Sequence, residues 1–365
     1  MDYFFLYFRT GFIGYKIVVG CILGASYYQA CTVQIVNERM KKNIAIIMGG
    51  YSSEFQISLK SGQVVYEYLD KERFDPFRIQ IRKDAWVYVD AQENESPVNK
   101  DDFSINTSSG KLRFDCVFNA IHGTPGEDGL MQAYLELLGI PQTSCNYYQA
   151  ALTFNKRDLL SVLKPYGIRS APSFYLDKGD VIDEKLIAAK VGMPCFVKAN
   201  KAGSSFGISK VYKIERLQEA IAKSFEEDDE IIIEGFLDGT EVSVGVIRYQ
   251  GETKVLPITE IVTENDFFDY EAKYEGKSQE ITPARISKSQ ERKVSEMAKK
   301  AYEVLKMKGY SRSEFIFVDN EPFMLEMNTT PGLTTESILP QQAAQAGISL
   351  PELFGSAIDE ALAEK

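Results

Sequence analysis

Two carboxylates and one amide near the C-terminal end of the sequence have the spacing of metal ligands. Glu326 and Asn328 lie two residues apart in a predicted strand, so both side chains point to the same face. Glu314 lies on the preceding predicted strand, close enough to join them. Carboxylate and amide oxygens are hard ligands that suit Mg²⁺ shared with nucleotide phosphates. The pattern therefore favours a metal site over the solvent-exposed face of a hairpin.

The other face of the same predicted hairpin is apolar, which supports this interpretation. We expect that face to carry Phe315, Phe317, Phe323, Leu325 and Met327. Arg312 lies on the same side of its strand as Glu314. Arg312 could serve only as a charge partner of the carboxylates, or it could stabilise negative charge that develops on a transferred group. The sequence alone leaves both roles open.

A loop rich in glycine and serine follows a predicted strand at residues 195–198. Backbone N–H groups of residues 203–207 (GSSFG) could surround phosphate oxygens, and Lys198 at the base of the loop could neutralise their charge. The arrangement is strand–loop–strand, and the G-x-x-x-x-G-K-[ST] pattern of a Walker A loop is absent from the sequence. A flexible hairpin with a solvated lysine is the alternative, and the loop alone does not decide between the two.

Two weaker features lie further along the chain. Glu234 and Glu241 flank a short hydrophobic segment, which could hold an adenine and a ribose. A predicted loop at residues 262–283 carries aromatic side chains between residues 267 and 274. Loops of this length inside a compact domain are usually functional, so we expect a lid that closes over a ligand. A static flap packed on a neighbouring domain is the alternative.

The order of the predicted elements indicates an α/β protein. Residues 44–48 form a strand that ends at two glycines, and Ser52 then offers an N-cap for a helix. This strand–turn–helix unit begins an open, mostly parallel sheet. A long helix is expected at residues 146–166. We expect four regions: an atypical extension (1–39), an N-terminal α/β domain (40–145), a central subdomain (146–237) and a C-terminal subdomain (238–365) that contains the long loop.

The composition excludes several classes of protein. The chain has 365 residues, of which 44% are hydrophobic and 25% charged, as in an ordinary globular protein of two or three domains. The 41 Lys and Arg and the 52 Asp and Glu give a formal net charge of −11, which disfavours a nucleic-acid partner. Five cysteines at wide spacings and a single histidine disfavour a disulfide framework and a Cys/His zinc site. We therefore expect a cytoplasmic protein.

Residues 1–39 differ in composition from the rest of the chain, because most of them are aromatic or apolar. The apolar run at residues 17–25 is much shorter than the about 20 residues of a membrane helix, so we expect no membrane partner. The run and the small residues after it also fit a signal peptide, but nothing downstream is typical of a secreted protein. Met40 directly precedes the first regular strand. We therefore expect a loosely held or spurious extension, with a membrane tether as the alternative.

Six motifs occur in a fixed order over about residues 41–350. They are residues 49–54 (GGYSSE), 122–129 (HGTPGEDG), Lys198 with 203–207 (GSSFG), 270–274 (YEAKY), Arg312 and 325–332 (LEMNTTPG). Together they resemble the successive signatures of the D-alanine–D-alanine ligase family, which belongs to the ATP-grasp superfamily. One glycine-serine loop would be weak evidence, whereas six ordered motifs are strong evidence.

The resemblance implies a three-domain ATP-grasp fold in which ATP lies between two small sheets and acts with two Mg²⁺ (or Mn²⁺) ions. It implies three sets of residues around ATP. The phosphates would contact Lys156, Lys198, Lys273, Ser204 and Ser205. The adenine and ribose would contact Glu234, Phe236, Leu237 and Glu241. The metal ions would be held by Glu314, Glu326 and Asn328.

The resemblance also implies that two D-alanines are joined through an acyl phosphate to make a peptidoglycan precursor, in an enzyme that we expect to be a homodimer. Glu54 would bind the ammonium of the first D-alanine, with His122 near its carboxylate, and Ser337 would hold the carboxylate of the second. Glu54, Ser204 and Tyr274 would form a hydrogen-bonded set. Arg312 and the Gly332 N–H would stabilise the acyl phosphate and the tetrahedral intermediate.

The sequence departs from the family pattern at two positions. Glu314 stands where the family usually has Asp, and Ala202 stands where an acidic residue often precedes the GSS triplet. The single histidine, His122, could also be a strand-end residue satisfied by backbone groups.

Three alternatives remain open at this stage. One is another ATP-grasp carboxylate–amine ligase or a D-alanine–D-lactate ligase, although the lactate enzymes usually lack the tyrosine at position 274. A second is a nucleotide-binding regulator without catalysis, against which the full set of lysines and metal ligands argues. The third is the membrane-tethered protein already described.

Overall fold

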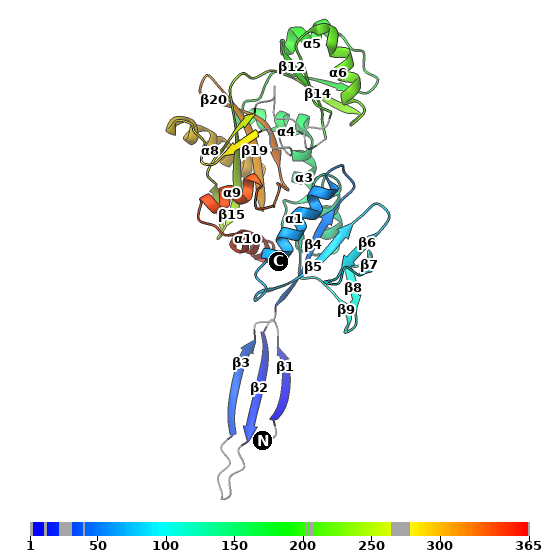
Figure 1. Cartoon of the computed structure of the whole chain (residues 1–365), viewed down its shortest axis with the longest axis vertical. Helices are drawn as coiled ribbons and strands as arrows, with labels where there is room; N and C mark the ends of the chain where they lie inside the picture. The colour runs from blue at the N-terminus through cyan, green and yellow to red at the C-terminus, as the bar shows by residue number, and fades with distance from the viewer. Residues whose placement is uncertain are drawn as a thin grey trace, which may run out of the picture.

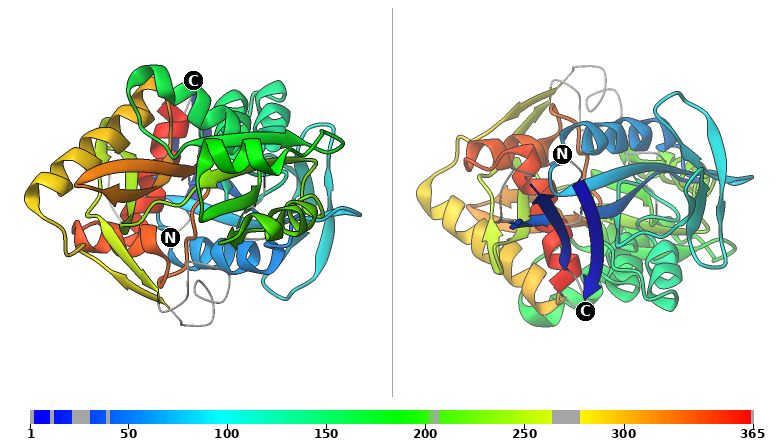
Figure 2. Two further views of the ribbon diagram at one scale, coloured as in Figure 1. Left: turned by 90° about the horizontal axis from the view of Figure 1, so that it is seen from above. Right: turned by 90° about the horizontal axis from the view of Figure 1, so that it is seen from below.

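The computed structural model describes residues 3–10, 13–21, 31–38, 41–201, 203, 207–263 and 278–363. Within these ranges the chain forms four separate sheets, of three, seven, four and six strands (Figure 1). In both views of Figure 2, α8 (Lys288–Val304) and the cyan strands of the seven-stranded sheet lie at opposite edges of the molecule. The mixed α/β class predicted from the sequence is confirmed.

The seven-stranded sheet is built around a parallel centre. β4 (Lys42–Gly49) lies between β10 (Cys116–Asn119) and β5 (Phe74–Ile81), and both pairings are parallel. Antiparallel pairings extend the sheet from β5 through β6 (Trp86–Val89), β7 (Glu95–Asn99), β8 (Ser104–Thr107) and β9 (Gly110–Leu112). Since β4 is buried on both faces, helices cover both: α1 (Phe55–Tyr68) and α10 (Leu350–Ala363) on one, α2 (Leu130–Leu137) on the other.

The four-stranded sheet is antiparallel and separates apolar from charged side chains. Its strands follow the order β11 (Ser173–Asp177), β14 (Glu230–Gly235), β12 (Cys195–Ala199) and β13 (Ser209–Val211). α5 (Glu184–Val191) and α6 (Leu217–Ser224) pack on one face, against Val197, Ile231 and Ile233. Because neighbouring side chains of a strand point to opposite faces, Lys198 and Glu234 lie on the other face.

The six-stranded sheet positions the predicted metal ligands. Its strands follow the order β18 (Ser278–Ile281), β17 (Thr259–Thr263), β15 (Thr240–Tyr249), β19 (Tyr310–Val318) and β20 (Glu321–Asn328), with β16 (Glu252–Val255) paired to β15. β19 and β20 form the predicted hairpin, in which Glu314 lies opposite Glu326 and Arg312 lies opposite Asn328. α8, α3 (Tyr147–Phe154) and α4 (Lys156–Leu163) pack around this sheet, and α9 (Ile338–Gln345) precedes α10.

A bulge in the hairpin corrects one prediction. The register between β19 and β20 shifts after Glu314, so that Phe315 pairs with Met324. Met324 therefore takes the buried position, and Leu325 lines the same pocket as Glu326 rather than the apolar face. Phe323 lies opposite Ile316, which lines the pocket, and is not among the buried residues of this core. The prediction was therefore wrong for Phe323 and Leu325, because strict alternation holds only where no extra residue is inserted.

Three further predictions about local structure need correction. The helix expected at 146–166 is two helices, α3 and α4, which are separated at Asn155. The N-cap of α1 is Glu54 rather than Ser52, whose hydroxyl instead donates to the carbonyl of His122 at 2.8 Å. The loop expected at 262–283 is shorter, because residues near both of its ends belong to the antiparallel strands β17 and β18. Residues 264–277 lie outside the described residues.

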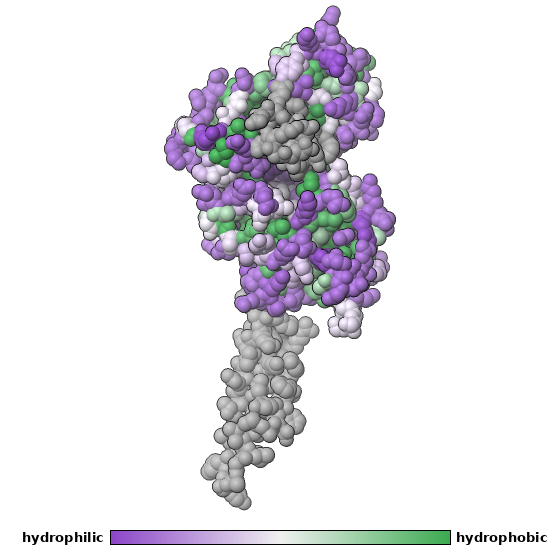
Figure 3. Space-filling model, in the orientation of Figure 1, coloured by the Kyte–Doolittle hydropathy of each residue, from purple (hydrophilic) through white to green (hydrophobic). Residues whose placement is uncertain are grey.

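The N-terminal segment forms a sheet of its own. β1 (Tyr3–Thr10), β2 (Ile13–Cys21) and β3 (Cys31–Glu38) pair antiparallel and share no strand with the other described sheets. Among the helices of the described residues, none combines the length and the hydrophobicity needed to cross a bilayer. On the face shown in Figure 3, hydrophobic residues of the coloured part lie in small scattered groups among hydrophilic ones.

The separate sheet leads to a prediction about truncation. A chain that begins at Met40 should keep the unfolding temperature of the full chain within about 2 °C, because β1–β3 pair only with one another and share no strand with the sheets that contain β4, β12 and β19. Thermal unfolding and turnover of the two chains would be measured in parallel. A large drop in either quantity would show that residues 1–39 belong to the working protein.

Candidate active site

A pocket of about 780 Å³ lies between the four-stranded and the six-stranded sheet. Its apolar lining comes from Ala171, Phe196, Ile208, Leu237, Ile316 and Leu325. Its charged lining comes from Lys156, Lys198, Glu234, Glu241, Glu314 and Glu326. An apolar pocket with a few convergent charges is the usual form of a small-molecule site. Seven of the residues predicted from the sequence thus line one pocket.

A largely buried ion pair lines this pocket. Lys198 Nζ donates to Glu234 Oε2 at 2.9 Å, and the side chain of Glu234 is only 3% exposed. Burial opposes the charged form of Lys198, but the neighbouring carboxylates, of which Glu234 acts most strongly, outweigh it and raise the pKa of Lys198. The lysine therefore carries a proton at neutral pH.

Glu234 has a second oxygen with a different environment. Its Oε1 is buried and accepts no hydrogen bond from the described residues. A buried acceptor without a donor is costly, so a ligand that presents an N–H group there would be favoured. Phe236, one residue beyond β14, packs its ring at a tilt against that of Phe196, which lines the same pocket, with 6.2 Å between the ring centroids.

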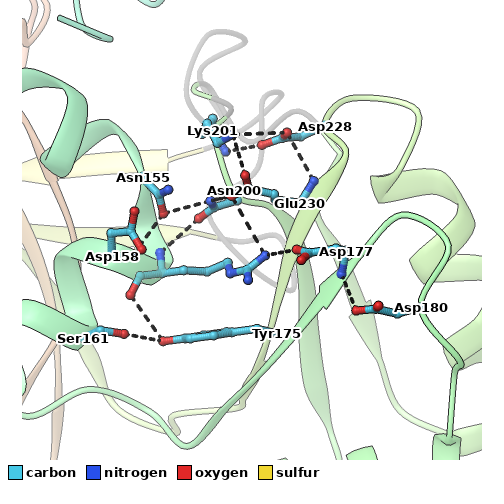
Figure 4. A network of polar contacts seen from close by, with 11 residues as sticks. Asn155, Asp158, Ser161, Tyr175, Asp177, Asp180, Asn200, Lys201, Asp228 and Glu230 are labelled. Carbon is cyan, nitrogen blue, oxygen red and sulfur yellow. Dashed lines mark hydrogen bonds and ion pairs between the residues drawn. The ribbon is translucent and has the colours of Figure 1, made fainter.

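The second lysine comes from the start of α4. Lys156 Nζ lies 3.3 Å from Glu326 Oε2 and its side chain is 11% exposed. Asn200, at the end of β12, contacts the first residues of α4 within a wider polar network (Figure 4). The two lysines therefore approach the pocket from separate elements that touch one another.

The residues of β19 and β20 supply a cation and three oxygen-bearing side chains. Arg312 forms an ion pair with Glu314 and also donates to Ser243 Oγ at 3.3 Å. Glu314 faces Glu326 across the hairpin. Glu326 and Asn328 also line a smaller adjoining pocket of about 400 Å³. Two carboxylates and an amide on one face form a donor set that suits a hard divalent cation.

Comparisons with known proteins agree with this geometry. The sequence profile of the D-ala D-ala ligase N-terminus matches residues 43–145, and that of the D-ala D-ala ligase C-terminus matches residues 162–359. The D-alanine–D-alanine ligase of Flavobacterium johnsoniae is 71% identical over 322 residues, which cover 88% of this chain and all of the relative. That of Christiangramia forsetii is 60% identical over 326 residues, covering 89% of this chain and all of the relative.

The chain belongs to the D-alanine–D-alanine ligase family.

Solved structures agree with this assignment. The VanG D-Ala:D-Ser ligase from Enterococcus faecalis superimposes with a TM-score of 0.78 at 31% identity, over 88% of this chain and all of that one. A D-alanine–D-alanine ligase from Bacillus anthracis complexed with ATP gives a TM-score of 0.72 at 28% identity, over 88% and 98% of the two chains. The ATP-grasp fold expected from the motifs is therefore confirmed.

Two further pairs of residues from the family motifs lie in close contact, and one of them borders the smaller pocket. A Cβ atom added to Gly203 would lie 2.5 Å from Glu54 Oε2, so the base of the glycine-serine loop contacts the predicted ligand of the first D-alanine. A Cβ atom on Gly332 would lie 2.6 Å from Ser337 Oγ, which also contacts Thr334 Oγ1 at 2.9 Å. A larger residue at either position would have to displace the neighbouring side chain. Ser204, Ser205, Lys273 and Tyr274 lie outside the described residues.

His122 is enclosed by the protein on both sides of its ring. Nδ1 donates to the carbonyl oxygen of Thr330 at 2.8 Å, which leaves Nε2 to accept from the hydroxyl of Ser61 at 2.9 Å. Burial lowers the pKa of His122, so the ring is neutral at pH 7. This arrangement favours a residue satisfied by protein groups over a direct ligand of the substrate carboxylate.

Glu127 is a functional candidate that the sequence did not single out. Its carboxyl group accepts from the N–H of Gly123 at 2.6 Å and from the N–H of Thr330 at 3.2 Å. His122 holds the carbonyl of the same Thr330. The peptide groups around Thr330 are thus held on both sides by the loop that follows β10, just before the predicted Gly332 N–H. Glu127 belongs to the motif at 122–129, where Asp128 is a second acidic residue. The local sequence does not show which of the two is buried, so it could not identify Glu127.

Burial and the negative charge of Glu54 raise the pKa of Glu127 to about 8. In the unfolded chain this group titrates near 4.5, so between these pH values the native state binds the extra proton and stability falls as pH rises. Glu127→Gln should remove this dependence. We expect the wild-type unfolding temperature to fall relative to that of Glu127→Gln as pH increases from 5 to 8.

Asp128→Asn is the matched control, because it likewise replaces a carboxyl group with an amide, at a less buried neighbour in the same loop. Its unfolding temperature should follow the wild-type pH profile. If Glu127→Gln and the wild type keep a constant difference across the range, Glu127 does not titrate as described.

Proposed function

We propose that this protein joins two D-alanines into D-alanyl-D-alanine, converting ATP to ADP and phosphate through a D-alanyl phosphate. The observation that carries the proposal is one pocket lined by two lysines and four glutamates, in a chain that is 71% identical to a D-alanine–D-alanine ligase over 88% of its own length. A carboxylate is a poor electrophile, and phosphorylation makes its carbon reactive towards an amine.

Nucleotide binding is assigned to the larger pocket. Lys156 and Lys198 would neutralise the phosphates, since both are largely buried and approach from different elements. The buried Oε1 of Glu234 would accept from the adenine amino group. Leu237 and Phe236 would pack against the base, and Glu241 would accept from the ribose. Lys273, Ser204 and Ser205 are proposed to contact the phosphates on the resemblance alone.

Glu314, Glu326 and Asn328 would hold two Mg²⁺ or Mn²⁺ ions, because their oxygens share one face and adjoin Lys156. Such ions neutralise phosphate charge when bound. The cations of the chain itself lie beside this set: Arg312 is paired with Glu314, and Lys156 with Glu326. Phosphoryl transfer depends mainly on positioning and charge neutralisation, which these groups supply.

The second half-reaction places an amine against the activated carbon. The amine nitrogen forms a bond to the acyl carbon, the bond from that carbon to the bridging oxygen breaks, and phosphate leaves. The Arg312 guanidinium and the Gly332 N–H would stabilise the oxyanion. Glu54 would bind the ammonium of the first D-alanine, His122 would act near its carboxylate through Thr330, and Ser337 would hold the second carboxylate. Ser204 and Tyr274 would complete the set with Glu54.

The choice of acceptor is the open part of the proposal. One structural neighbour is named a D-Ala:D-Ser ligase, and D-lactate is a further candidate acceptor. The curated relatives named above favour D-alanine. The product would serve as a peptidoglycan precursor, made in the cytoplasm by a homodimer that binds no nucleic acid.

The purified chain would be incubated with ATP, Mg²⁺ and single or paired D- and L-amino acids, and phosphate and dipeptide would be measured. We expect phosphate release that depends on D-alanine, with one D-alanyl-D-alanine for each phosphate. Phosphate release without dipeptide, or preference for another amino acid, would contradict the proposal.

Glu326→Gln tests the metal site. The substitution keeps the shape of the side chain but removes the charge, so turnover should fall by about 100-fold or more at ordinary Mg²⁺. The unfolding temperature should change little. Glu303→Gln, on the exposed face of α8, is a control that should retain full activity. Near-wild-type turnover of Glu326→Gln would refute the assignment.

Tyr274→Phe tests acceptor choice. Tyr274 is a neutral hydroxyl with an ordinary pKa of about 10, so it adds no cation that would repel an ammonium acceptor. Removing the hydroxyl should loosen the hydrogen-bonded set and raise the use of D-lactate relative to D-alanine. The ratio of the two products would be measured from pH 6 to 9 for both proteins, and an unchanged ratio throughout would contradict this role.

A further inference from the structure

Asn200 lies at the junction of the two elements that carry the pocket lysines. It directly follows β12, two residues after Lys198, and none of its surface is exposed. Its backbone N–H donates to the carbonyl of Glu230 at 2.9 Å, which continues the pairing of β12 with β14. Its position relative to Lys198 is therefore fixed by the sheet.

The same residue supplies acceptors to the start of α4. The N–H of Lys156 donates to the carbonyl of Asn200 at 3.4 Å, and the N–H of Arg157 donates to Asn200 Oδ1 at 3.0 Å. The N–H of Asp158 donates to Asn155 Oδ1 at 3.0 Å. The first amides of a helix have no acceptor within the helix itself. Here two asparagines supply these acceptors, and one of them belongs to a distant strand.

An amide is the group that this position requires. Asn200 Nδ2 donates to Asn155 Oδ1 and to Glu230 Oε2, both at 2.8 Å, while Oδ1 accepts from Arg157. Figure 4 shows Asn200 between Asn155 and Glu230, with Lys201 and Asp228 beyond them. A carboxylate at position 200 would bring acceptors against acceptors, because it has no N–H to donate.

The contacts of Glu230 make the network stiff. Its Oε1 accepts from Lys201 Nζ at 2.9 Å while its Oε2 accepts from Asn200. Lys201 is held a second time, since its N–H donates to Asp228 Oδ2 at 2.7 Å. The chain is thus held both before Asn200, by β12, and after it, by Lys201. The start of α4 therefore contacts a fixed group.

We propose that Asn200 is a positioning residue that holds Lys156 and Lys198 at the spacing needed to bind the phosphates of the nucleotide. Lys156 is the first residue of α4, and Lys198 is two residues before Asn200, so the Asn200 contacts set the separation of their backbones. The inference rests on the proposed function. It states that Asn200, which contacts neither substrate, supports the binding of ATP but not the binding of D-alanine.

Asn200→Ala and Asn200→Asp test this role. We expect each to raise the KM for ATP and the Kd for ADP about tenfold, the size of effect that follows when buried polar groups lose a partner. The KM for D-alanine should change less than about twofold, because Glu54, Gly332 and Ser337 lie on other elements. ADP binding would be measured by calorimetry, separately from turnover.

Asp183→Ala is the matched control for simple loss of helix stability. Asp183 caps α5 in the same sheet layer by accepting from the N–H of Leu186 at 3.0 Å, but it has no contact with either lysine. It should lower the unfolding temperature, by less than Asn200→Ala does because Asp183 is exposed and Asn200 is buried, and leave ADP binding unchanged. If the Asn200 variants lose stability while ADP binding stays at the wild-type value, the proposal is wrong.

A rescue experiment tests the network directly. In Asn200→Asp with Glu230→Gln, the amide and the carboxylate exchange places, so a Gln N–H donates to the new Asp oxygen. ADP affinity should recover at least threefold relative to Asn200→Asp alone, and no recovery would count against the proposal.

A second variant is available if Asn200→Ala fails to fold. Asn155→Ser keeps a good N-cap residue but is too short to reach Asn200, so it should weaken ADP binding several-fold. Wild-type ADP affinity in Asn155→Ser would overturn the proposal. If the wild type binds ADP but makes no dipeptide, the proposed function is wrong. The ADP-binding measurements would then still test whether Asn200 positions the two lysines.

Discussion

Charges that are shielded from water must be paired, and this constraint shapes the whole pocket. Among the described residues, the two lysines that line it and the nearby Arg312 each have a carboxylate partner: Lys198 with Glu234, Lys156 with Glu326, and Arg312 with Glu314. The pairs keep the cations in place while no phosphate is bound. They also keep the carboxylates from repelling one another in a pocket that holds four of them. A nucleotide with its metal ions brings both signs of charge and can take over these partners.

Two of the pairs join elements that are separate in the sequence, whereas Arg312 and Glu314 lie on the same strand. Lys198 and Glu234 belong to one sheet, Arg312 and Glu314 to another, and the pair of Lys156 with Glu326 connects α4 to β20. Two further contacts connect the loop after β10, in the seven-stranded sheet, to the same place, because His122 and Glu127 hold both sides of Thr330. The site is therefore a meeting point of three sheets, and its geometry depends on their packing.

The sequence was sufficient to predict the parts of the site that follow from local periodicity. Glu326 and Asn328 share a face because side chains alternate along a strand, and the hairpin brings Glu314 opposite them. Alternation did not predict the bulge that turns Leu325 into the pocket. The break at Asn155 was also missed, because part of the cap that makes α4 a separate helix comes from Asn200. The burial of Glu127 depends on Thr330, 203 residues away, and no local pattern contains it.

The central claim is that the carboxylate of one D-alanine is phosphorylated before the second amine attacks. This route moves one carboxylate oxygen into phosphate, because the bond that breaks in the second step joins the acyl carbon to that oxygen. The direct measurement uses D-alanine labelled with oxygen-18 in its carboxylate, with unlabelled ATP, and mass spectrometry of the released phosphate. The account predicts one labelled oxygen in each phosphate for each dipeptide formed. Dipeptide formed together with unlabelled phosphate would contradict it.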